Sequence, residues 1–116
     1  MIIGRFYFIQ TENGNLLGEY SNQLSVRNTP ESAEMVDRNG LFFGNYNSTW
    51  FEQNDNSPIL MRLRISPKDD SAERIYRLEW TENAVPQFRG EGFIVNGILV
   101  GNYWDIDLEN RLNQGF

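Results

Sequence analysis

The chain contains no cysteine and no histidine, and each absence excludes a class of chemistry. Without cysteine there is no disulfide framework, no thiolate nucleophile and no Cys-ligated zinc or iron–sulfur site. Without histidine the chain lacks the usual zinc and haem ligand, the usual general base near neutral pH and any Ser-His-Asp triad. Catalysis would have to use Asp, Glu, Tyr, Lys or Arg. We therefore predict no catalytic residue, no metal site and no cofactor.

Positive charge is also scarce. The 116 residues include 10 Lys and Arg against 16 Asp and Glu, which gives a net charge of −6. An acidic surface repels phosphate backbones, so we expect no binding to nucleic acid or to an anionic membrane. No apolar run reaches the roughly 18 residues of a membrane span. The N-terminus lacks the basic start and cleavage site of a signal peptide, so a cytoplasmic location is expected, although a chain whose signal had been removed would read the same.

Aromatic residues are abundant: the chain has eight Phe, five Tyr and three Trp, and 40% of its residues are hydrophobic. With modest charge, that composition argues against disorder. A chain of this length can bury one hydrophobic core without covalent staples. We predict a single domain over residues 1–116.

One phrase occurs three times, as NGNLLGEY (13–20), NGLFFGNY (39–46) and NGILVGNY (96–103). Asn-Gly between apolar runs is a strong hairpin signal, because a type I′ turn needs positive φ at both central residues. In each copy the later glycine and the tyrosine two residues on share a strand face. A strand glycine often marks a bend, and a neighbouring aromatic ring can lie across it. We interpret the phrase as scaffold: three hairpins, each followed by a bend.

The rest of the chain also alternates like strands, with turn signals about every dozen residues. We expect an all-β, antiparallel up-and-down meander. A sheet of about eight strands tends to curl or close, which removes its edges, so a barrel or half-barrel should result. The expected strands are 2–11, 15–20, 33–38, 41–53, 58–66, 73–80, 87–95 and 98–106.

Two segments are less clear. Residues 21–32 are too long for a hairpin loop: Leu24–Val26 could form a short strand, or Thr29 could cap a helix with Pro30 at its first position. The tail from Asp107 to Phe116 could form one helical turn that plugs an open barrel end through Leu108 and Leu112.

The first copy of the phrase, from Asn13 to Tyr20, resembles the Asp-Gly-x-Leu-x-Gly-x-Tyr strand of avidin and streptavidin. A Trp ending a strand at Trp80, with a Gly-rich strand after it, is similar to that family and to the wider lipocalin-like (calycin) group. The resemblance implies an eight-stranded barrel, often oligomeric and often open at one end. Gly4-Arg5-Phe6 stands where the family opens with Gly-Thr-Trp, so only the fold is transferred and no biotin-binding residue is assigned.

The candidate ligand-binding residues are aromatic. Tyr46 and Trp50 share one strand face, and Tyr76 and Trp80 share another. If both faces point inward, they line an interior with polar tips, as small-ligand sites do. Arg74, on the Tyr76 face, could orient a carboxylate. The predicted ligand is thus small and apolar, or a carboxylate. A filled aromatic core is the competing interpretation, because eight-stranded barrels are just wide enough for side chains to fill.

Two other functions stay open. A homo-dimer or tetramer with a structural role would follow if Phe42, Leu99 or Tyr103 faced outward, since a sheet apolar on both faces needs a cover. A cofactor-free barrel enzyme using Tyr, Glu and Arg would be favoured by an inward Glu or Asp with a raised pKa beside a Tyr in a cleft.

Overall fold

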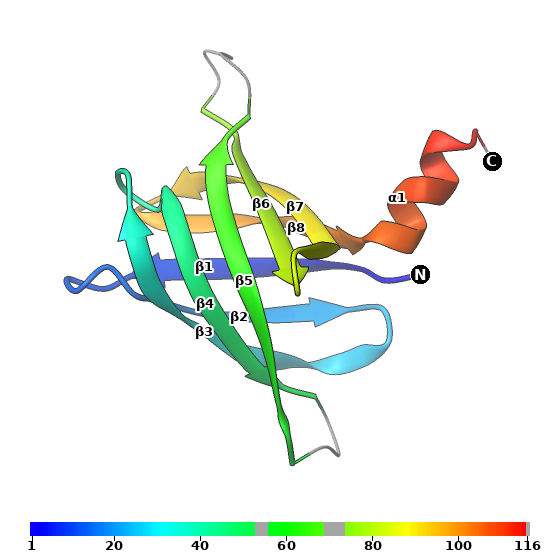
Figure 1. Cartoon of the computed structure of the whole chain (residues 1–116), viewed down its shortest axis with the longest axis horizontal. Coiled ribbons are helices and arrows are strands. Elements are labelled where there is room, and N and C mark those ends of the chain that lie inside the picture. The colour runs from blue at the N-terminus through cyan, green and yellow to red at the C-terminus, as the bar shows by residue number, and fades with distance from the viewer. Residues whose placement is uncertain (53–55, 69–73, 116) are drawn as a thin grey trace.

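The computed structural model describes residues 1–52, 56–68 and 74–115. Eight antiparallel strands close into a barrel in chain order, and the helix α1 follows them (Figure 1). The elements are β1 (Ile3–Gln10), β2 (Leu16–Asn22), β3 (Ser25–Arg38), β4 (Gly44–Phe51), β5 (Pro58–Pro67), β6 (Tyr76–Glu82), β7 (Val85–Val95), β8 (Ile98–Asp105) and α1 (Ile106–Asn113). Because β1 pairs with β8, the barrel is closed, and the predicted all-β meander is confirmed.

The three Asn-Gly pairs all lie at tight reversals, as predicted. Asn96 and Gly97 form a two-residue turn with φ of 51° and 80°, the left-handed conformation that a type I′ turn requires. The other two pairs lie in five-residue turns. Thr11 N donates to Asn15 O at 2.8 Å around the first pair, and Asn39 N donates to Phe43 O at 2.8 Å around the second.

Residues 25–38 form one long strand, so the helix considered at Thr29 is wrong. Thr29 pairs with Tyr20, and Pro30 pairs with Glu19. The turn before the strand is held by Asn22, whose Oδ1 accepts a hydrogen bond from Leu24 N at 2.9 Å. Residues 21–32 therefore contain a hairpin, and the proline is accommodated in an extended strand rather than at a helix start.

The strand predicted over 41–53 begins only at Gly44. Phe42 has φ of 65°, which cannot continue a strand, and its side chain is completely buried. Its backbone N donates to Gln10 Oε1 at 2.7 Å. The apolar run that looked like strand thus turns inward to cover one end of the barrel. Residues 53 and 73, at ends of two predicted strands, lie outside the described residues.

That end of the barrel is filled with aromatic rings. Phe43 stacks on Tyr76 with centroids 4.7 Å apart, and Phe42 meets Tyr76 edge-on at 6.3 Å. Tyr46 is completely buried; its hydroxyl donates to Phe42 O at 2.8 Å and accepts from Gln10 Nε2 at 3.0 Å. We call this the closed end. Here the filled-core interpretation holds.

The opposite end, which we call the open end, is not plugged by the tail. Helix α1 extends away from the barrel (Figure 1), and Leu112 is 59% exposed. Asp105 caps the helix by accepting from Leu108 N at 2.9 Å, while Glu109 pairs with Arg89 on the outer surface of β7. No helix in the described parts of the chain is long and apolar enough to span a membrane.

Phe42, Leu99 and Tyr103 all point into the barrel, so the expectation that they might face outward is wrong. Other apolar side chains do lie outside, among them Ile9, Leu17 and Phe93 at 42%, 48% and 55% exposure. Strand alternation explains the difference. Tyr103 occupies an inward position, opposite the inward Gly90 of the neighbouring strand β7.

Strand glycines allow close packing of the barrel wall. A Cβ on Gly18 would lie 2.8 Å from the Phe8 ring, and one on Gly4 would lie 2.6 Å from the Tyr103 ring. Phe8 is paired with Gly18 and Tyr103 with Gly4 across neighbouring strands. Aromatic rings therefore do cover strand glycines, but here they come from the adjacent strand and not from two residues further along.

We predict that Gly101→Ala destabilises the barrel by about 3 kcal/mol or more, the upper range for overpacking. An added Cβ would lie 2.0 Å from Glu91 O and 2.7 Å from Gly92 Cα, both backbone atoms that cannot rotate away. Gly97→Asn is the control, because its Cβ meets nothing within 4 Å and Asn tolerates positive φ. Urea unfolding measures both variants. Equal stability of Gly101→Ala and wild type would contradict this close contact.

Candidate functional site: an acidic aromatic pocket at the open end

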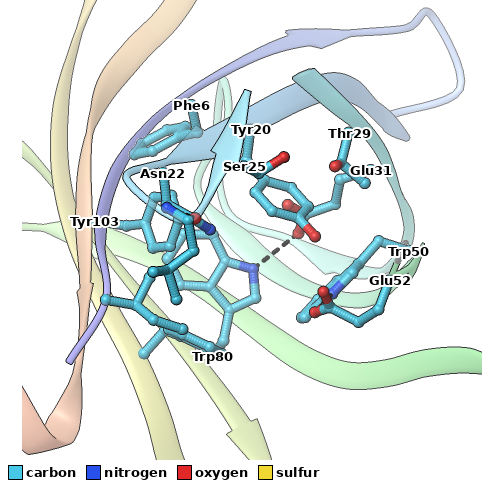
Figure 2. A pocket seen from close by; sticks show the side chains of 13 residues that line it. Phe6, Tyr20, Asn22, Ser25, Thr29, Glu31, Trp50, Glu52, Trp80 and Tyr103 are labelled. Carbon is cyan, nitrogen blue, oxygen red and sulfur yellow. Dashed lines mark hydrogen bonds between the residues drawn. The ribbon is translucent and has the colours of Figure 1, made fainter. Parts of the chain in front are cut away.

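The open end holds a cavity of about 190 Å³ (Figure 2). A dry apolar cavity of about 150 Å³ accommodates benzene, so this volume suits a molecule of about one ring. The lining combines aromatic, aliphatic, amide, hydroxyl and carboxylate side chains: Ile2, Phe6, Tyr20, Asn22, Leu24, Ser25, Thr29, Glu31, Trp50, Glu52, Trp80, Phe88 and Tyr103.

The rings of the pocket come from strand positions near the opening, where alternate residues point inward. Tyr20 meets Trp50 at 6.0 Å with planes at 73°, and meets Tyr103 at 6.0 Å and 89°. The Phe88 ring lies 5.9 Å from the Tyr103 ring, centroid to centroid, with an angle of 72° between the planes. The Trp80 ring lies 6.2 Å from it, with an angle of 59°. All five of these rings line the cavity.

Glu31 lies deep in the pocket on an inward position of β3. Its side chain is only 5% exposed, and its Oε2 accepts from Ser48 Oγ at 2.5 Å and from Trp80 Nε1 at 2.9 Å, the bond drawn in Figure 2. None of the described residues donates a hydrogen bond to Oε1. Burial raises the pKa of Glu31 to about 7, because desolvation of the carboxylate outweighs the two hydrogen bonds that lower it.

Glu52 lies at the rim, just beyond the end of β4. It is exposed, and its Oε1 accepts from Trp50 Nε1 at 3.1 Å. Burial, together with the negative charges of Glu52 and Glu31, raises the pKa values of Tyr20 and Tyr103 to about 12. Hydrogen bonds from Thr29 and Asn22 oppose these shifts only in part. Both phenols therefore remain protonated and can act as hydrogen-bond donors.

The pocket has a negative electrostatic character. Glu31 and Glu52 are its charged side chains, and neither Lys nor Arg occurs in its lining among the described residues. The N-terminal amine of Met1, next to the lining residue Ile2, lies 3.9 Å from Asp105 and 3.8 Å from Asp107. That amine is thus already neutralised by carboxylates outside the cavity.

Of the predicted ligand-binding residues, Trp50 and Trp80 line this pocket. Tyr46 and Tyr76 point inward as expected but lie at the closed end, packed among Phe42 and Phe43. Residues four apart on a strand share a face but are separated by roughly 13 Å along it. Sharing a face therefore does not place two rings at one site.

Arg74 is exposed and precedes β6 at the closed end, so it does not reach the pocket. Sequence reasoning extended the strand to residue 73 and so placed Arg74 on the Tyr76 face. In the structure Arg74 has φ of 50°, which interrupts the extended backbone before the strand begins. A carboxylate ligand in the cavity would have no partner in Arg74.

The sequence pattern did not indicate Glu31 or Glu52 as site residues, and it indicated scaffold roles for Tyr20 and Tyr103. Glu31 sits between Pro30 and Ser32 in a segment rich in polar residues, which reads as surface. Its burial follows from register: Leu16 pairs with Ala33, and Glu31 lies two residues before Ala33 on the same inward face. That register becomes visible only once residues 25–38 are recognised as a strand.

No protein-family model, curated protein or solved structure matches this chain. The resemblance to avidin and to the lipocalin-like group is therefore borne out at the level of an eight-stranded antiparallel barrel and no finer.

We predict that Glu31 makes the protein less stable as the pH rises from 4.5 to 7. In this window the folded state holds a proton on Glu31 that the unfolded state has released, so the free energy of unfolding falls with pH. The shift of the Glu31 pKa from 4.5 to about 7 corresponds to a decrease of about 3 kcal/mol in the free energy of unfolding. This decrease is complete above about pH 7.

Urea unfolding of wild type and Glu31→Gln at pH 4.5 and pH 8 tests this prediction. The glutamine variant should gain about 3 kcal/mol relative to wild type between the two conditions. Glu34→Gln, on the exposed face of the same strand, should show no such gain. Parallel pH profiles for wild type and Glu31→Gln would mean that Glu31 is hydrated in solution.

Proposed function

We propose that this protein is a small-ligand-binding barrel, and that the ligand occupies the aromatic pocket at the open end. The observation that carries the proposal is the contrast between the two ends. Phe42, Tyr46 and Tyr76 fill the closed end, while the rings at the open end surround a cavity of about 190 Å³. Binding sites are typically concave and mostly apolar, with a few polar groups that fix orientation.

The proposal extends to the kind of module. The closed eight-stranded barrel supports a lipocalin- or avidin-like arrangement, with the ligand entering at one mouth. Fold alone does not give function, so the support comes from the pocket and not from the topology. A cytoplasmic location stays a prediction from composition.

A cofactor-free enzyme is the second candidate, and one observation favours it. Glu31 is an inward carboxylate with its pKa raised to about 7, in the same cavity as the phenols of Tyr20 and Tyr103. A buried base near neutral pH can remove a proton from a carbon acid, and a phenol can hold the resulting oxyanion. Small carbon acids that bind would then exchange C–H for C–D in D₂O with the wild type but not with Glu31→Gln.

A homo-oligomer is the remaining alternative. Ile9, Leu17 and Phe93 leave apolar surface on the outside of the barrel. Light scattering measures the oligomeric state. A monomer would exclude the structural homo-oligomer, whereas a dimer or tetramer would be compatible with both this role and ligand binding.

We predict that Trp50→Leu weakens binding of single-ring fragments at least tenfold, because the fragment loses a wall of its pocket. Trp104→Leu is the matched control. Trp104 lies outside the cavity, where its Nε1 donates to Glu109 at 3.4 Å, so its loss should leave affinity unchanged. A fragment panel screened by ligand-observed NMR gives the affinities. If no fragment binds, or if both variants bind like wild type, the pocket is not the site.

A further inference from the structure

We infer that the ligand is a small organic cation, a protonated amine or a quaternary ammonium, held between the aromatic walls and the carboxylates Glu31 and Glu52. This inference rests on the proposed binding function and narrows it to one chemical class.

The aromatic walls provide the first part of the argument. The face of an aromatic ring carries partial negative charge and attracts a cation within about 6 Å of its centre, most strongly for Trp and Tyr. Trp50, Trp80, Tyr20 and Tyr103 all line the cavity. Tyr20 stands at 73° to Trp50 and at 89° to Tyr103, so the rings form adjoining walls and not a stack. A box of this kind suits a rounded, weakly hydrated cation better than a flat one.

The carboxylates are the second argument for a cation, because one lies deep in the cavity and the other at its rim. Glu31 lies at depth and has its Oε1 without a donor among the described residues, while Glu52 lies at the rim. A buried carboxylate is costly unless it is paired, hydrogen-bonded or protonated. A cation in the cavity would pair with Glu31 and allow it to ionise.

The charges of the lining residues disfavour the opposite class, an anionic ligand. Apart from Glu31 and Glu52, the titratable side chains of the lining are the phenols of Tyr20 and Tyr103. An anionic ligand would be repelled by both carboxylates and would find no Lys or Arg among the described lining residues. The predicted carboxylate ligand is thus disfavoured, and the volume of about 190 Å³ limits a cation to about one ring or one trimethylammonium group with a short tail.

A matched pair of probes tests the charge directly. Choline and 3,3-dimethylbutan-1-ol have the same shape, but only choline is charged. We expect wild type at pH 8 to bind choline at least tenfold more tightly than the neutral alcohol, with tetramethylammonium also binding. Ligand-observed NMR or calorimetry gives the affinities, and acetate serves as an anion that should not bind.

Variants then assign the preference to the carboxylates. Glu31→Gln and Glu52→Gln should each weaken choline binding about tenfold and leave the affinity for the alcohol unchanged. Glu34→Gln, exposed on the outer face of the same strand as Glu31, should have no effect. Choline affinity should also rise with pH between 6 and 8 in wild type but not in Glu31→Gln, because the proton on Glu31 competes with the cation. Circular dichroism confirms folding, and Glu52→Gln at the exposed rim keeps the test valid if Glu31→Gln does not fold.

The outcomes separate this inference from the proposed function. Equal binding of choline and its neutral isostere, or binding of neutral fragments with no binding of either cation, overturns the cation inference and leaves a ligand-binding barrel. Failure of every probe and every fragment overturns both. Tighter binding of choline that survives both Gln substitutions overturns the role of the carboxylates.

Discussion

The pairing of β1 with β8 is the constraint on which the rest of this structure depends. Once the first and last strands are joined, the eight strands form a closed barrel. The interior of such a barrel is just wide enough for side chains to fill. Gly4 of β1 lets the two strands approach closely, because a Cβ there would lie 2.6 Å from the ring of Tyr103, its partner in β8. All inward side chains then share one narrow interior. They fill it at the closed end and leave a cavity at the open end.

The closed end is an ordinary aromatic core with satisfied polar tips, as the hydroxyl of Tyr46 illustrates. The open end has rings of similar size, but these line a cavity that also contains the buried Glu31. A carboxylate at that depth lowers stability at neutral pH, and core packing gives no reason to keep it there. The proposed binding role and the alternative proton-transfer role would each give that carboxylate a use, and both rely on the same side chain.

The sequence alone predicted the antiparallel meander of about eight strands and its Asn-Gly hairpins, because alternation and Asn-Gly turns are local signals. It left open whether the barrel closes and whether the first half of β3 is strand or helix, and it began β4 too early. It also grouped Trp50 and Trp80 with faces that would line the interior if they pointed inward, as both do. It could not give depth along the barrel axis, so Tyr46 and Tyr76 were grouped with rings that lie at the other end. Glu31 and Phe42 were misjudged for a related reason. Glu31 is a polar residue that points inward because of the pairing register of β3. Phe42 is an apolar residue whose positive φ places it outside any strand.

Asp105 has a consequence for how the molecule can be handled. Its Oδ2 accepts from Ile2 N at 2.9 Å while its Oδ1 caps α1, so one side chain fastens both the start of β1 and the start of the helix beside the mouth. A support or fusion partner attached at the N-terminus will therefore lie beside the entrance, because Ile2 lines the pocket. Attachment through the Asn96-Gly97 turn, at the far end, leaves that entrance facing solvent.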